Sequence, residues 1–102
     1  MIESHAYLLV IQPSTLDFIQ NLVNYYISEA SAYRQIAEIY ADEVADISAT
    51  TFGIIWGCVY SGFLQAYANQ KQNPPLEDIQ EFNQLMKQRV TEIKKAIRGA
   101  KS

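Results

Sequence analysis

The chain has 102 residues, of which 49% are hydrophobic, and its net charge is −3. This length is typical of a single domain, and the apolar fraction is sufficient for a hydrophobic core. Cys58 is the only cysteine, which excludes an internal disulfide and therefore a disulfide-stapled secreted scaffold.

The charges are distributed unevenly along the chain. Residues 1–49 contain seven acids and one base, whereas residues 50–102 contain four acids and seven bases. The excess of acids, and the acids interleaved among the C-terminal bases, argue against nucleic-acid binding. The first residues, MIESHAYLLVIQ, carry an acid where a secretory signal would carry bases, so we expect a cytoplasmic protein.

We expect residues 1–102 to form one helical domain, with residues 1–12 as an N-terminal arm. The stretch AYLLVIQP has the composition of a strand, but no other segment is a suitable strand partner. The arm is therefore expected to be a short helix or an extended segment that packs over apolar surface.

Residues 14–47 are predicted to form one long amphipathic helix, because apolar residues recur at helical spacing without an intervening Gly or Pro. One series repeats every seven residues, and a second follows it four residues later: Ile19, Tyr26, Tyr33, Tyr40 and Ile47, then Val23, Ala30, Ala37 and Val44. The alternative is a break near SEAS (28–31), which would give a compact four-helix monomer.

The next helix is predicted over residues 51–70, a segment with no charged side chain. The stretch SATT (48–51) favours a turn in which Thr50 or Thr51 caps this helix, although a smooth continuation is the alternative. Its densest apolar part, GIIWGCVYSGFL, covers 12 residues, whereas a membrane span needs about 20. We therefore expect a core helix and not a membrane span.

Small residues form columns on this helix. A glycine inside a helix costs roughly 1 kcal/mol relative to alanine, and close approach of a neighbouring helix is the usual reason to keep one. We predict close helix packing at Gly53, Gly57, Ser61 and Gly62.

The last helix is predicted over residues 75–98. The NPP sequence at 73–75 breaks the chain, acids occupy the first turn, bases occupy the last, and Gly99 follows as a cap. The predicted apolar stripe of this helix is Ile79, Phe82, Met86, Val90, Ile93 and Ile97.

These elements predict an all-α bundle of three main helices, one of them long, completed by a second copy in a dimer. The middle helix would cover the long one only back to about residue 26, so the N-terminal part of the long helix would project with its apolar side chains uncovered. We expect a homodimer, although the N-terminal arm folded over this surface is the alternative. The candidate interface is Leu16, Phe18, Ile19, Leu22, Val23, Tyr26 and Tyr33.

Acids cluster at the C-terminal end of the first predicted helix, and the bases at the end of the last helix are expected to face them: Glu38, Asp42, Glu43 and Asp46 against Lys94, Lys95 and Arg98. A divalent cation site or a docking patch for a basic partner is the alternative. Glu29 and Glu43 are fourteen residues apart, roughly 21 Å along a helix, which is too far to act on one bond. His5 is the only histidine, so the Glu-x-x-His motif of di-metal bundles is missing.

The sequence contains no catalytic, cofactor-binding or metal-binding constellation. We expect a non-enzymatic protein–protein interaction module, such as an adaptor, an assembly factor or a regulatory or structural subunit, that acts as a helical homodimer. Its partners would be a second copy of the chain and other proteins. One alternative is a membrane-associated or filament-forming subunit that uses the uncharged helix 52–68. Another is a ligand-binding or catalytic bundle with a pocket lined by Tyr26, Tyr33 and Tyr40.

Overall fold

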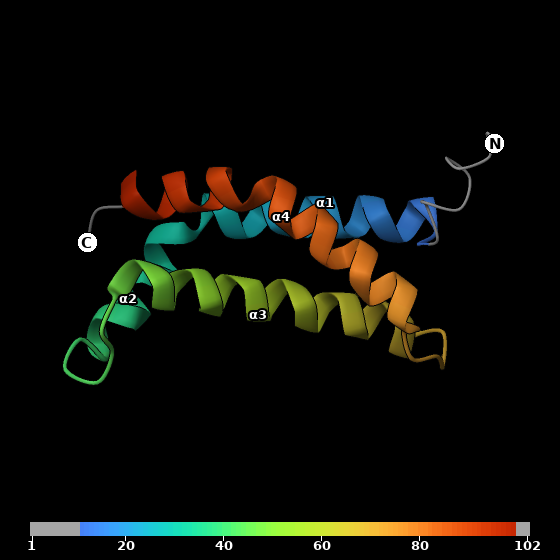
Figure 1. The fold of residues 1–102 in the computed structure, drawn as a ribbon, viewed down its shortest axis with the longest axis horizontal. Coiled ribbons are helices and arrows are strands. Elements are labelled where there is room, and N and C mark those ends of the chain that lie inside the picture. Colours follow the sequence, from blue (N-terminus) through green and yellow to red (C-terminus); the bar gives the residue numbers. More distant parts are fainter. Residues whose placement is uncertain (1–10, 100–102) are drawn as a thin grey trace.

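The computed structural model describes residues 11–99, which form four helices and no strand: α1 (Pro13–Ser28), α2 (Ala30–Ile39), α3 (Ile47–Ala68) and α4 (Leu76–Gly99). The all-α prediction is confirmed. In Figure 1, α1 and α4 run in the same direction, α3 runs back against them, and α2 crosses at one end. Helix α3 contacts the other three. The expected N-terminal arm falls mostly on residues 1–10, outside the described range.

The predicted helix over residues 14–47 is interrupted at Glu29, so residues 11–99 form four helices and not three. Glu29 lies between α1 and α2 with φ −106° and ψ 18°, outside the helical region. The Ser28 hydroxyl donates a 2.6 Å hydrogen bond to the carbonyl of Tyr25, one turn earlier. Such bonds from serine to the backbone compete with the regular helix and bend it. The break falls within the SEAS segment that the alternative specified.

The break removes the geometric argument for the dimer, because that argument required one continuous helix over residues 14–47. Helix α1 packs against both α3 and α4. Ile19 and Val23, which were predicted to need a second copy, are completely buried within one chain. Neither residue is therefore available for contact with a second copy.

The turn between the first and second predicted helices lies earlier than expected. Helix α2 ends at Ile39, and α3 begins at Ile47 with Asp46 as its cap. The Asp46 carboxylate accepts a 3.0 Å hydrogen bond from the backbone N–H of Ala49. Thr51, a predicted cap, lies inside α3, where its buried hydroxyl donates to the carbonyl of Ile47. Either a threonine or an aspartate can cap a helix, and here the aspartate does so.

Helix α4 agrees with its prediction to within one residue at each end. Its buried positions include four of the six predicted stripe residues, and Ile79 and Val90 are half-buried. Aromatic stacking joins it to α3, because the rings of Phe63 and Phe82 are 4.6 Å apart between centroids and both are fully buried. Stacked aromatic pairs contribute about 0.5–1.5 kcal/mol beyond the area that they bury.

Lys71, in the turn between α3 and α4, has a φ of 59°, in the left-handed region that favours glycine. We expect Lys71→Gly to stabilise the fold by up to about 1 kcal/mol, because a side chain in this conformation costs roughly 1–2 kcal/mol. Lys87→Gly, at an exposed site inside α4, should destabilise by about 0.5–1 kcal/mol. Urea unfolding of both variants measures these changes. A change of the same sign in the two free energies of unfolding would contradict the prediction.

Candidate interaction surfaces

Helix α3 has two opposite faces of different character. Its buried residues recur every four positions: Thr51, Ile55, Val59, Phe63 and Tyr67. The opposite side, which we call the α3 outer face, is half-buried or exposed and consists of Gly53, Ile54, Gly57, Ser61 and Leu64. None of these residues carries a charge. An uncharged helix is normally covered on all sides, yet this chain covers mainly one.

The glycines of α3 divide into two groups by their surroundings. At Gly62 an added Cβ would lie 2.2 Å from Cδ2 of Leu22, so α1 and α3 approach closely there. At Gly53 and Gly57 an added Cβ would meet no atom within 4 Å, and Ser61 is exposed. No other helix of the same chain therefore explains why residues 53 and 57 are glycines.

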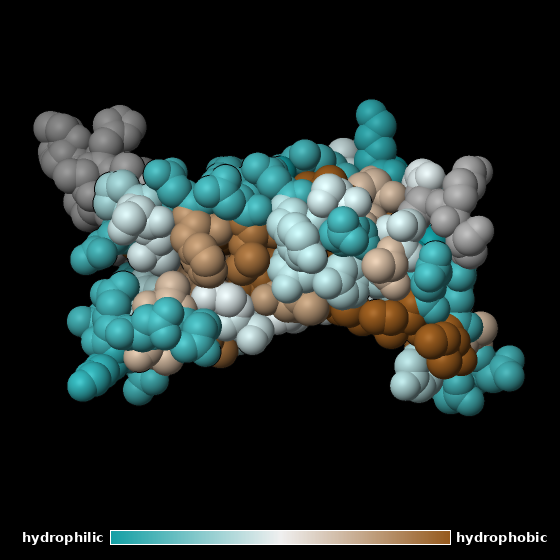
Figure 2. Space-filling model, turned by 180° about the vertical axis from the view of Figure 1, so that it is seen from behind, coloured by the Kyte–Doolittle hydropathy of each residue, from teal (hydrophilic) through white to brown (hydrophobic). Residues whose placement is uncertain are grey.

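The predicted interface residues of the first helix are mostly internal. Leu16, Leu22, Tyr26 and Tyr33 are partly buried against the core, and Phe18 alone is exposed, at 44%. Figure 2 shows apolar surface at the end of the molecule that contains α2, and a separate apolar patch nearer the opposite end. The exposed large apolar residues of the described chain are Phe18, Tyr25, Ile36, Ile39, Tyr40, Leu64 and Leu76.

The predicted tyrosine face is only partly assembled. Tyr26 and Tyr33 meet edge to face, with ring centroids 5.4 Å apart. Burial, followed by the nearby Cys58 thiol, raises the pKa of both hydroxyls above the usual value for tyrosine. Tyr40 lies beyond the end of α2 and is exposed. The predicted face is therefore formed by Tyr26 and Tyr33, whereas Tyr40 lies among the exposed residues after α2.

Tyr67 and Asp78 form a buried polar contact that joins the end of α3 to the start of α4. The Tyr67 hydroxyl donates to Oδ2 of Asp78, and both residues are buried. Burial, and then the hydrogen bond to Asp78, raise the pKa of Tyr67 well above its usual value. The sequence pattern did not reveal this pair, although Tyr67 shares the four-residue spacing of the buried stripe.

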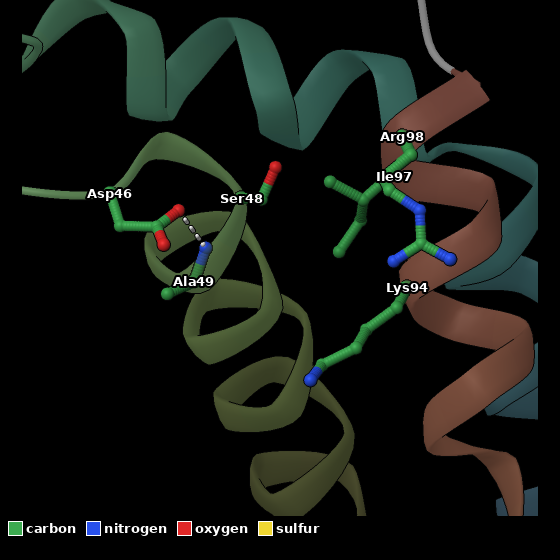
Figure 3. A pocket seen from close by; sticks show the side chains of 6 residues that line it. All are labelled: Asp46, Ser48, Ala49, Lys94, Ile97 and Arg98. Atoms are coloured by element: carbon green, nitrogen blue, oxygen red, sulfur yellow. Dashed lines mark hydrogen bonds between the residues drawn. The ribbon is translucent and has the colours of Figure 1, made fainter.

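The acids at the end of α2 and in the loop before α3 have different partners. Glu38 forms an ion pair with Arg34, 3.3 Å from its Nε, and Arg34 also donates to the carbonyl of Ile97 near the end of α4. Asp46 caps α3, as described above. The predicted proximity to the C-terminal bases is seen at one place, because Asp46, Lys94 and Arg98 line one small surface pocket (Figure 3).

This pocket, of about 170 Å³, combines the first turn of α3 with two basic side chains. Both basic residues are exposed, and Figure 3 shows the carboxylate of Asp46 bound to the backbone N–H of Ala49. A carboxylate in the same pocket opposes an anion there, so the geometry does not define a phosphate site.

The structure shows how the candidate metal-binding and nucleophilic side chains lie within residues 11–99. No group of three His, Cys, Asp or Glu side chains there is close enough to hold a metal ion. Cys58 is half-buried beside Tyr26, and Glu29 and Glu43 lie in different segments on either side of α2.

Helix α3 is the one helix in the described part of the chain that is long and apolar enough to cross a membrane. Its most apolar 18-residue window has a mean hydropathy of 1.4, and 22% of that window is buried. Length and composition alone are weak evidence, since the core helix of a soluble protein also has these properties.

Comparison with known proteins gives no relative. No family model matches the chain, and no curated protein and no solved structure is significantly similar to it.

Removal of the Tyr67 hydroxyl should destabilise the fold at neutral pH. We expect Tyr67→Phe to cost about 1–3 kcal/mol, because the buried carboxylate of Asp78 loses its donor. Tyr40→Phe, at an exposed hydroxyl, should change stability by less than about 0.5 kcal/mol. Denaturant unfolding at pH 7 measures both, and equal costs would contradict the role of this pair.

The same pair should produce alkaline sensitivity. The pKa of Tyr67 is higher in the folded state than in the unfolded chain, so its stabilisation is complete below pH of about 10 and is lost above it. The free energy of unfolding of the wild type should therefore fall above that pH, and that of Tyr67→Phe should fall less steeply. Parallel profiles for the two proteins would overturn this assignment.

Proposed function

We propose that this protein is a non-enzymatic, cytoplasmic protein–protein interaction module that acts as a homodimer through the α3 outer face. The observation that carries the proposal is the uncharged surface opposite the buried stripe of α3, where Gly53 and Gly57 have open space above them. A second helix packed on this surface would explain both the missing charges and the glycines.

A second copy of the chain is the simplest occupant. In a two-fold dimer each subunit presents the same patch, so α3 would pack against α3. Small residues at four-residue spacing allow two backbones to approach closely, and Ile54 and Leu64 beside them would interlock across the contact. The face is uncharged, so this self-contact would bury no like charges.

A second candidate function is that of a membrane-associated or filament subunit that uses α3, supported by the hydropathy of this helix. Insertion would require Ile55, Val59 and Phe63 to leave the core in which they are completely buried, which is why we favour the dimer. A chain that floats with lipid vesicles in a density gradient would reverse this preference.

The dimer predicts a specific response to substitution. Light scattering across about a hundredfold range of concentration should show a species of twice 11.6 kDa for the wild type. Gly57→Leu should convert the dimer to a monomer. It should keep the helical circular dichroism spectrum, because a Cβ added at this position points into open space, with no contact to another helix within 4 Å.

Gly99→Leu is the matched control, since a Cβ there also meets open space but at the end of α4. It should leave the dimer intact. A wild type that is monomeric at every concentration, or a Gly57→Leu chain that stays dimeric, would contradict the proposed interface.

A further inference from the structure

Helix α2 and the residue that follows it carry apolar side chains that the bundle does not cover. Ala30 and Ala37 are buried in the fold. The exposed residues, which we call the α2 stripe, are Ala32, Ile36 and Ile39 of α2 and Tyr40 directly after it. Ile36, Ile39 and Tyr40 are exposed by 41%, 74% and 53%. An exposed apolar face on a short helix is not needed for folding and is typical of a contact surface.

Acidic residues border this stripe closely. Residues 35–70 contain Glu38, Asp42, Glu43 and Asp46 and no base, but Arg34 pairs with Glu38 and Asp46 caps α3, so the acidic border consists of Asp42 and Glu43. The chain turns directly after α2, where the backbone N–H of Glu43 donates a 2.8 Å hydrogen bond to the carbonyl of Tyr40. This turn holds the exposed Asp42 and Glu43 beside the end of the stripe.

We propose that the α2 stripe and its acidic border bind a basic amphipathic helix of another protein. The apolar side chains at positions 32, 36 and 39 are four and then three residues apart, so they share one side of α2 that can pack against a second helix. The exposed carboxylates would attract lysine and arginine on the flanks of that helix and repel acidic segments. In Figure 2 the apolar surface at the α2 end is bordered by hydrophilic side chains.

The charge also excludes other occupants. An anionic membrane surface would be repelled by the same carboxylates, since it binds basic segments. A nucleic acid would be repelled for the same reason. The surface is separate from the α3 outer face, so the two proposals stand or fall independently.

A synthetic peptide of about 18 residues, five helical turns, tests the proposal. It carries leucine at helical spacing on one face and lysine on the other, and binding is measured by calorimetry. We expect the wild type to bind it, and the double variant Ile36→Ser with Ile39→Ser to bind at least about tenfold more weakly. Asp42→Asn with Glu43→Gln should also weaken binding and reduce its dependence on salt.

Two controls make the result specific. Leu76→Ser removes an apolar side chain of similar exposure (66%) from the start of α4 and should leave binding unchanged. A peptide with glutamate in place of lysine should not bind. The proposal is overturned if the lysine peptide shows a Kd weaker than about 1 mM, or if Leu76→Ser reduces binding as much as the α2 variant.

The mass in solution of the α2 double variant shows whether the α2 stripe binds a second copy of the chain or another protein. We expect this variant to keep the oligomeric state of the wild type, whereas Gly57→Leu changes that state without loss of peptide binding. If the α2 variant alone converts a dimer to a monomer, the stripe binds a second copy and the proposed partner is wrong.

Discussion

The absence of charge on α3 is the constraint on which the rest of the structure depends. A 22-residue helix with no acidic or basic side chain must be covered, and α1, α2 and α4 all contact it. Their coverage is one-sided, because the buried residues follow a single four-residue spacing from Thr51 to Tyr67. The homodimer that we propose would cover the opposite side.

The sequence predicted the helical class and the last helix well, because local and periodic signals agree there. The proline pair, the acidic first turn and the apolar stripe of α4 all indicate the same boundaries. The first helix was predicted as continuous because its seven-residue series runs through Glu29. At the break, the Ser28 hydroxyl donates a hydrogen bond to the backbone carbonyl of Tyr25. The spacing of apolar residues contains no signal for such a bond.

The candidate surfaces were harder to predict, since a pattern does not say which side of a helix the chain itself covers. The small residues of α3 indicate close packing, but only the structure separates Gly62, which meets Leu22, from Gly57, which meets nothing. The α2 stripe was missed for a related reason. Ile36 and Ile39 belong to neither of the two apolar series that predicted the long helix, and they are exposed in the structure, where α2 ends at Ile39.

The free energy of unfolding of Gly57→Ala, measured at a concentration where the wild type is expected to be dimeric, tests the central claim most directly. Alanine is favoured over glycine inside a helix by about 1 kcal/mol. If a second copy packs closely on α3, as we propose, the added methyl group displaces it and the variant is less stable than the wild type. A gain of about 1 kcal/mol would show that the face is open to water and would contradict the dimer.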